Sequence, residues 1–219
     1  MLDLTRQSGL IDGARAENTS VRIIGAGAIG SHVAEVLAKM GVRHIWVQDF
    51  DTVESHNLPN QGYYLHELGK PKVDALAERL NVGTGAAVVA EFTKLEEPTP
   101  CRQEIIVAAV DSMETRRVIF DSFVRSPLSS VLVDGRMGAR FGKVLFCEKQ
   151  IPGRLQEYEE TLHAGGLYQE PCTEKSTIFC AYGISGVIGA FIAKYLMEEP
   201  VQRSADIDFS HMYMDRVAA

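Results

Sequence analysis

The sequence predicts an α/β protein with a Rossmann-like, doubly wound sheet, mainly parallel and with antiparallel strands in its C-terminal part. Short β-branched segments alternate with segments whose apolar residues recur at helical spacing, and this alternation is typical of a parallel sheet. The first apolar segment ends in a glycine-rich turn, and two later ones end near an acidic residue. Because the chain has 219 residues, 46% of them hydrophobic, we expect one domain over residues 1–219.

The chain opens with a strand, a turn, a helix and a second strand. Residues 21–25 (VRIIG) form a short β-branched run that favours a buried parallel strand. Apolar side chains in residues 29–40 recur at the spacing of one helix face, and Gly41 fits the C-terminal cap of that helix. Residues 44–50 (HIWVQDF) are the second strand. This order is typical of the first unit of a doubly wound sheet.

The alternation continues along the chain. Helices are expected at residues 71–80, with proline in the first turn, and at residues 113–125. Further strands are expected at residues 86–91, 104–111, 130–135 and 142–149. The last of these is predicted to be antiparallel, because the connection before it is too short for a crossover helix.

The C-terminal third has a different character. Residues 151–176 are polar and carry glycine and proline without clear periodicity, so we interpret them as a long loop. The apolar stretch at residues 177–199 predicts one long buried helix.

Composition excludes several classes of function. The formal net charge is −7, and the basic residues form no cluster of the kind that a nucleic-acid surface needs. No uninterrupted apolar run reaches the roughly 18 residues of a membrane span. The four cysteines are scattered without a C-x-x-C pair, which argues against a structural zinc site. We therefore expect a cytoplasmic protein with free thiols that binds neither nucleic acid nor a membrane.

The glycine-rich turn GAGAIG places Gly25, Gly27 and Gly30 between a strand and a helix. Glycines in this pattern let the backbone approach a phosphate group at a helix N-terminus, where free N–H groups point at the anion. Asp49 ends the next strand, where a carboxylate can accept hydrogen bonds from ribose hydroxyls. On these residues alone a nicotinamide or flavin enzyme is the favoured interpretation, and a purely structural turn is the alternative.

The segment that begins at Asp49 favours ATP instead. It reads DFDTVESHNLPNQGYYLHELGKPKVDAL, and its Asp-x-Asp-x-Val run adds Asp51 to the nucleotide-binding candidates. Asn57 and Asn60 can hold polar atoms near the phosphates, and Lys72 supplies a mobile positive charge. A dehydrogenase has little reason to carry these residues in this order. For Lys72 taken alone, the alternative is that it starts a solvated helix.

Five short motifs occur in an order that matches one known family. They are Gly25–Gly30, Asp49–Val53, Asn57-Leu58 with Gln61, Gly69–Lys72, and Asp111-Ser112 with Arg116. Arg6-Gln7 near the start and Gly186-Val187-Ile188-Gly189 near the end extend the series. In this order they resemble the ThiF/MoeB/HesA adenylyltransferases, the bacterial relatives of the ubiquitin-activating enzymes. Each motif alone is weak, but together and in register they are specific.

The resemblance implies a single ThiF-type adenylation domain with ATP and Mg²⁺. The implied roles are approach to the ATP phosphates for Gly25, Gly27 and Gly30, ribose binding for Asp49, triphosphate contact for Asn57 and Lys72, and Mg²⁺ binding for Asp111. Arg6 would reach into the site of a neighbouring subunit, so the resemblance implies a homodimer. The implied reaction is attack on the α-phosphate by the carboxylate of a ubiquitin-like or sulfur-carrier protein that ends in Gly-Gly, with release of pyrophosphate.

Some positions depart from the family pattern or leave a role open. Asn60 stands where the family usually has an arginine, and a neutral amide cannot neutralise a phosphate. Arg136 and Arg140 are candidates for a substitute cation, the alternative being solvated loop residues. The sequence around Cys172 resembles that around thioester-forming thiols, and the alternative is a loop cysteine without a catalytic role. His32 could approach a phosphate, although a position on the helix surface is the favoured interpretation.

Other functions stay open at this point. An NAD-dependent oxidoreductase accounts only for residues 21–49. A non-catalytic nucleotide-binding scaffold of the same family is kept open by Asn60, although Lys72 and Asp111 argue against it. ATP-dependent chemistry on a tRNA-bound carboxylate is disfavoured by the acidic charge of the chain.

Overall fold

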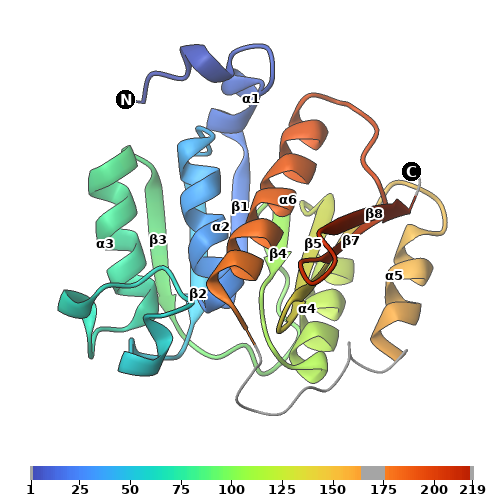
Figure 1. Ribbon diagram of the computed structural model, residues 1–219. Coiled ribbons are helices and arrows are strands. Elements are labelled where there is room, and N and C mark those ends of the chain that lie inside the picture. The colour runs from blue at the N-terminus through green and yellow to red at the C-terminus, as the bar shows by residue number, and fades with distance from the viewer. Residues whose placement is uncertain (1, 164–175, 218–219) are drawn as a thin grey trace.

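The computed structural model describes residues 2–163 and 176–217, which are built around one eight-stranded sheet (Figure 1). The strand order is β3-β2-β1-β4-β5-β6-β7-β8. Strands β1 to β5 pair in parallel, and β6, β7 and β8 continue the sheet antiparallel. The predicted fold class is therefore confirmed. The strands are β1 Ser20–Ile24, β2 His44–Asp49, β3 Ala87–Phe92, β4 Ile105–Ala108, β5 Val131–Gly138, β6 Phe141–Glu148, β7 Ser204–Asp208 and β8 Tyr213–Val217.

Helices cover both faces of the sheet. Helices α2, α3 and α6 lie on one face and α4 and α5 on the other, whereas α1 lies near the start of β1 (Figure 1). The α-helices are α1 Gly13–Asn18, α2 Ala28–Lys39, α3 Lys72–Thr84, α4 Met113–Arg125, α5 Arg154–His163 and α6 Ile178–Leu196. Short 3₁₀ helices occur at Thr5–Gln7, Ser55–Asn57 and Leu65–Glu67.

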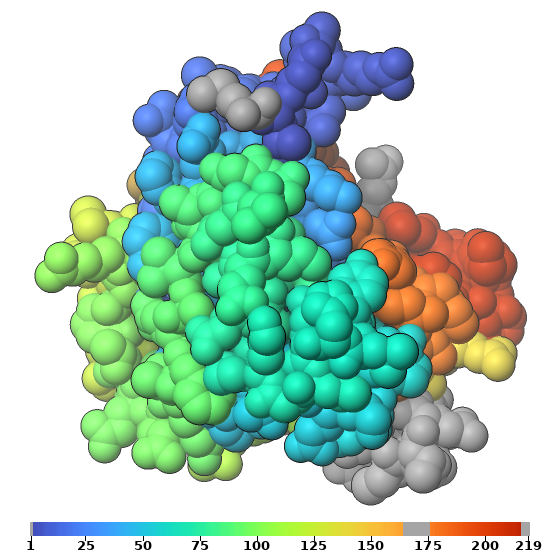
Figure 2. Space-filling model, turned by 90° about the vertical axis from the view of Figure 1, so that its left-hand side faces the viewer, coloured from blue at the N-terminus to red at the C-terminus, as the bar shows by residue number. Residues whose placement is uncertain are grey.

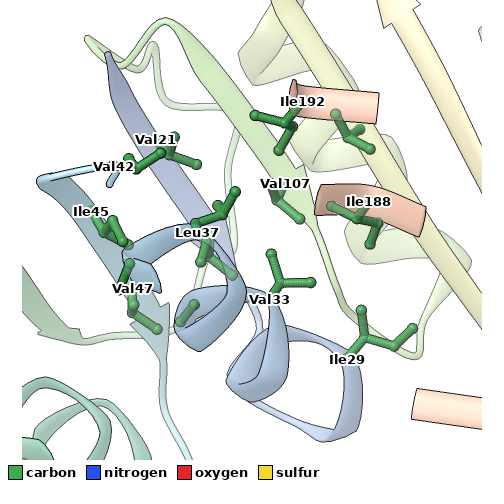
Figure 3. Packing of buried hydrophobic residues seen from close by; sticks show 14 of the residues in the cluster. Val21, Ile29, Val33, Leu37, Val42, Ile45, Val47, Val107, Ile188 and Ile192 are labelled. Carbon is green, nitrogen blue, oxygen red and sulfur yellow. The ribbon is translucent and has the colours of Figure 1, made fainter. Parts of the chain in front are cut away.

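The core between β1, β2, β4, α2 and α6 fixes the position of α2. Ile29, Val33 and Leu37 lie on the inner side of α2 and point toward the strands, while Ile188 and Ile192 of α6 meet them from the side (Figure 3). Burying each such side chain contributes about 1.5–3 kcal/mol relative to leaving it in water. The N-terminus of α2 is therefore held firmly at one edge of the sheet.

The strand register gathers the predicted site residues at that edge. Ile24, the last residue of β1, is paired with Gln48 of β2 and with Ala108 of β4. Because parallel strands end at the same edge of a sheet, the turn after β1, Asp49 at the end of β2 and Asp111 beyond β4 lie together. This edge is where ligands bind in open α/β sheets.

The interpretation of residues 151–176 as a loop is wrong for the part that forms α5. Leu155, Tyr158 and Leu162 recur three and four positions apart and pack on the cluster around α4. Three apolar residues among polar ones gave too weak a periodicity to identify the helix from the sequence. Residues 164–175 lie outside the described residues.

Helix α6 confirms the long apolar helix predicted for residues 177–199. In the described part of the chain it alone is long and apolar enough to cross a membrane, a test that core helices also pass. Here it packs on the sheet, with Ile184, Ile188 and Ile192 fully buried. Cys180 on the same helix is also buried and belongs to the core.

Candidate functional site

The glycine turn connects β1 to α2, and its three glycines differ in their surroundings. Gly25 has a φ of +95°, and a Cβ atom there would overlap the carbonyl oxygen of Ala109. A Cβ atom on Gly30 would overlap the carbonyl oxygen of Gly25. In contrast, no described atom lies within 4 Å of a Cβ atom built on Gly27. Gly25 and Gly30 are needed for packing, whereas the backbone at Gly27 is open to a ligand.

Asp49 is tied to this turn. Its Oδ2 accepts a hydrogen bond from the backbone N–H of Ala26 at 2.6 Å, and its Oδ1 accepts one from the N–H of Asp51 at 2.8 Å. Each carboxylate oxygen can accept a second hydrogen bond, and the side chain is only partly buried. The structure thus places Asp49 beside the turn, with acceptor capacity left for a ribose hydroxyl.

Residues 57–63 dock on the same turn through two side chains. The hydroxyl of Tyr63 donates to the carbonyl oxygen of Ala26 at 2.7 Å, and burial raises the pKa of Tyr63, so that it stays a donor. The hydroxyl of Ser31 donates to the carbonyl oxygen of Gly27 at 2.7 Å and accepts from the N–H of Gly62 at 2.9 Å. The loop that carries the predicted asparagines is therefore fixed next to the turn.

Lys72 begins α3 and is almost completely buried, with 4% of its surface exposed. Its Nζ lies 2.9 Å from Oδ2 of Asp51, and its backbone N–H donates to the carbonyl oxygen of Asp51. The Asp51 side chain is half exposed. A buried lysine anchored in this way does not fit the solvated-helix alternative. Its ammonium group is held at a defined place near the end of β2.

The two asparagines have different partners. Asn57 is buried, and its Oδ1 accepts a hydrogen bond from the N–H of Glu54 at 2.9 Å, so it shapes its own 3₁₀ turn. The side chain of Asn60 donates to the hydroxyl of Ser176, just before α6. Figure 2 shows the segment around residue 60 next to the first half of α6. Asn60 thus connects the loop after β2 to the start of α6.

Asp111 lies beyond the end of β4 with an exposed side chain, immediately before Ser112, which caps α4. Within residues 2–163 and 176–217, no group of three or more His, Cys, Asp or Glu side chains is arranged to hold a metal ion. Mg²⁺ in nucleotide sites is usually held by one or two carboxylates together with phosphate oxygens and water. One exposed carboxylate at this edge fits that donor set.

A buried ionic network beside the site was not identified from the sequence. Asp134 on β5 is fully buried and accepts hydrogen bonds from Nε of Arg116 at 2.9 Å, Nε of Arg136 at 2.7 Å and the hydroxyl of Tyr158 at 3.1 Å. Arg136 also donates to Thr161. Arg136 is therefore neither the candidate phosphate cation nor the solvated loop residue of the alternative, because its guanidinium group is engaged inside the protein. One acidic residue within an apolar strand was the only signal of this network.

The remaining predicted residues are Arg6, Arg140 and Cys172. Arg6 is exposed in the 3₁₀ helix whose Gln7 donates to the carbonyl oxygen of Lys39, at the C-terminal end of α2. Since the twelve residues of α2 span about 18 Å, Arg6 is far from the glycine turn of its own chain. Arg140 is exposed at the turn between β5 and β6. Cys172 lies outside the described residues.

The helix-surface interpretation of His32 is wrong. Only 2% of this residue is exposed, and its ring centroid lies 4.2 Å from that of Tyr182 on α6. Burial lowers the pKa of His32 below its usual value. The apolar spacing of α2 did not reveal this position, because the cover comes from α6 and from residues 60–62, which are distant in sequence.

The chain is similar to several curated proteins. The adenylyltransferase and sulfurtransferase MOCS3 of Culex quinquefasciatus is 29% identical over 197 residues, which cover 82% of this chain and 41% of the relative. The NEDD8-activating enzyme E1 catalytic subunit of Arabidopsis thaliana is 32% identical over 116 residues, covering 51% of this chain and 25% of the relative. The chain thus spans less than half the length of these relatives.

Solved structures share the fold. Escherichia coli MccB in complex with ATP superposes with a TM-score of 0.75 at 16% identity, over 94% of this chain and 65% of that chain. PaaA superposes with a TM-score of 0.71 at 14% identity, over 94% of this chain and 65% of that chain. At these identities the likeness concerns the fold alone. The model of the ThiF family, however, matches residues 6–211, nearly the whole chain, and the protein therefore belongs to the ThiF family.

Proposed function

We propose that this protein uses ATP to adenylate the C-terminal glycine carboxylate of a ubiquitin-like or sulfur-carrier protein. The observation that carries the proposal is the open backbone at Gly27, with the Lys72 ammonium group and the Asp111 carboxylate at the same edge of the sheet. A phosphate cradle, a fixed cation and an exposed metal-binding acid are what a nucleoside triphosphate requires. A nicotinamide dinucleotide would need only the first of them.

In this proposal the chain contributes positioning and charge. The N–H groups at the start of α2 and the Lys72 ammonium group bind phosphate oxygens, and Asp49 binds the ribose. Asp111 would hold Mg²⁺, which when bound neutralises part of the phosphate charge. An oxygen of the carrier carboxylate attacks the α-phosphorus, and the bond from that phosphorus to the bridging oxygen of pyrophosphate breaks. The carboxylate is already ionised at neutral pH, so no general base is needed.

The relatives support the carrier class, and the fold supports the nucleotide. By name, MOCS3 is an adenylyltransferase and sulfurtransferase and the NEDD8 relative is an activating enzyme, and MccB has been solved with ATP and with MccA. A homodimer, with Arg6 of one protomer near the site of the other, belongs to the same proposal. The support for it is the position of Arg6 far from its own glycine turn.

The proposal can be tested by calorimetric titration with ATP and Mg²⁺, with NAD as the competing ligand. Lys72→Ala removes the buried ammonium group, and Lys70→Ala is the matched control, because Lys70 pairs at the surface with Glu78. A charge-assisted hydrogen bond contributes about 1.5–3 kcal/mol, so we expect Lys72→Ala to weaken ATP binding about 10- to 150-fold. Lys70→Ala should bind ATP like the wild type.

A second measurement tests the chemistry. Exchange of labelled pyrophosphate into ATP should require a carrier whose tail ends in Gly-Gly, and should stop when that carboxylate is amidated. ATP binding without any exchange would favour a nucleotide-binding scaffold. If the protein binds NAD and Lys72→Ala does not change that binding, the proposal is contradicted and an oxidoreductase becomes the favoured function.

A further inference from the structure

Unpartnered polar atoms concentrate at one place in the described part of the chain. Within residues 2–163 and 176–217, five buried side-chain atoms lack a hydrogen-bond partner. Four of them lie at this place: the two ring nitrogens of His32, Oδ1 of Asn60 and Oε1 of Gln61. The fifth is Nη1 of Arg154, on the opposite face of the sheet. Since buried polar groups are nearly always hydrogen-bonded, four orphan atoms in three neighbouring side chains indicate a site that a ligand completes.

This cluster borders the phosphate cradle. Ser31 bonds both to the carbonyl oxygen of Gly27 and to the N–H of Gly62, so the loop and the glycine turn are joined by one side chain. A Cβ atom on Gly62 would lie 3.4 Å from Nδ1 of His32, which places the imidazole against the same loop. The ring of Tyr182 packs on the imidazole on one side, and Tyr182 itself is 57% exposed, so only one solvent-facing side chain separates the imidazole from water there.

All three side chains can present a donor to a ligand. The NH₂ group of Asn60 donates to the hydroxyl of Ser176. If the amide is rotated by 180°, its oxygen takes that place and accepts a hydrogen bond from the same hydroxyl, because a hydroxyl can donate as well as accept. The NH₂ group then faces the position of the unpartnered oxygen and is free to donate to a ligand. The amide of Gln61 can be rotated in the same way without breaking a hydrogen bond of Oε1, because Oε1 has no partner. His32 carries one N–H in either tautomer. Three donors on neighbouring side chains beside a phosphate cradle suit an anion with several oxygen acceptors.

The charge on the imidazole responds to such an anion. Burial lowers the pKa of His32 and Arg79 on α3 lowers it further, whereas the carboxylate of Glu35 on α2 raises it. The backbone carbonyl of Asn60 also raises this pKa by lying close to the ring, although it forms no hydrogen bond of good geometry with either ring nitrogen. The ring of Tyr182 on α6 lies against the imidazole. A bound phosphate adds negative charge next to the ring and raises the pKa again.

We propose that His32, together with Asn60 and Gln61, binds the terminal phosphate of the nucleoside triphosphate and takes up a proton as that phosphate enters. This inference rests on the proposed function, because it presupposes that ATP occupies the glycine turn. Because the protonated imidazole binds the phosphate better, ATP binding becomes tighter as the pH falls from 8 toward 6. ADP, which lacks the terminal phosphate, binds with an affinity that His32 does not influence.

The experiment is calorimetric titration of the full chain with ATP and with ADP between pH 6 and pH 8. His32→Phe keeps a ring against Tyr182 but removes both nitrogens. Asn60→Asp keeps the shape of the side chain but cannot offer an NH₂ group. The matched control is His44→Phe, at the exposed start of β2 and the opposite edge of the sheet. Thermal unfolding checks that each variant is folded.

We expect His32→Phe to weaken ATP binding about 10-fold at pH 6, to abolish its pH dependence and to leave ADP unchanged. Asn60→Asp should also weaken ATP selectively, and His44→Phe should match the wild type. Titrations of the wild type in buffers of different ionisation enthalpy measure how many protons are taken up when a nucleotide binds. This measurement needs no variant, so it remains valid if a variant fails to fold. Greater uptake with ATP than with ADP supports the inference.

Equal uptake with both nucleotides, or equal weakening of ATP and ADP in a folded His32→Phe variant, overturns the inference and leaves the proposed function standing. If the wild type binds neither nucleotide, the proposed function fails, and the inference fails with it.

Discussion

The difference between Gly27 and Gly30 separates ligand binding from folding. At Gly27, φ is −80°, a value that any residue adopts, and a Cβ atom would meet no described atom within 4 Å. At Gly30 a Cβ atom would overlap the carbonyl oxygen of Gly25. Gly27→Ala therefore places a methyl group only where a phosphate is expected, whereas Gly30→Ala places one inside the turn.

The expected magnitudes follow from these surroundings. An alanine that adopts the native φ and ψ changes the free energy of unfolding by less than about 1 kcal/mol. Gly27→Ala should therefore keep the stability of the wild type but lose at least one charge-assisted hydrogen bond to phosphate, about 1.5–3 kcal/mol, or a 10- to 150-fold weaker affinity for ATP. Gly30→Ala should lower the free energy of unfolding by about 1–3 kcal/mol, the usual cost of overpacking.

Urea denaturation measures the stability of both variants, and calorimetry with ATP and Mg²⁺ measures binding. The reasoning predicts a double dissociation, in which Gly27→Ala is stable but binds poorly and Gly30→Ala is destabilised. A Gly27→Ala variant that binds ATP like the wild type would refute it, because phosphates could then not lie against this turn. Loss of stability in Gly27→Ala would show that the backbone there is packed.

Further predictions concern the surroundings of the turn. Tyr63→Phe removes the hydroxyl that donates to the carbonyl oxygen of Ala26, so the free energy of unfolding, measured by urea denaturation, should fall by about 1–2 kcal/mol. Tyr64→Phe at an exposed position should leave it unchanged. Asp134→Asn leaves two buried guanidinium groups without their carboxylate, and thermal unfolding should report a loss of about 3–5 kcal/mol. Because the pKa of His32 is lowered in the folded state, the unfolded chain binds the proton first, so stability should fall as the pH drops below about 6.5, less steeply in His32→Phe. Burial raises the pKa of Cys147 to about 12, so iodoacetamide at pH 8 should modify this thiol only after unfolding, as peptide mapping can check.

Six of the eight strands and α2 could be predicted from the sequence because their signals are local, whereas β7 and β8 were not identified. β-branched runs, the spacing of Val33 and Leu37, and Gly41 at the end of the helix all act within a few residues. The doubly wound, mainly parallel architecture also followed, since alternating strands and helices leave few topologies. Helix α5 was missed because its apolar face is only three residues wide.

The candidate site was only partly predictable, since its details depend on residues far apart in sequence. The sequence marks Asp51 and Lys72 as polar candidates, but it does not say that they pair, because that contact depends on where α3 begins relative to β2. The three glycines look alike in the motif, yet Ala109, more than eighty positions later, decides that Gly25 is packed. The burial of His32 likewise depends on α6. A pattern identifies the residue types, and tertiary contacts assign their roles.

The network around Asp134 also has an electrostatic consequence. One carboxylate faces the guanidinium groups of Arg116 and Arg136, so this buried group carries an excess positive charge in a protein whose formal net charge is −7. Asp134 is paired in register with Ala108, at the end of the strand next to the glycine turn. Salt screens a buried charge less than an exposed one, so its field reaches the edge of the sheet. We therefore expect a polyanion to be repelled by the net charge of the protein but drawn toward this edge, and added salt to weaken both effects at long range.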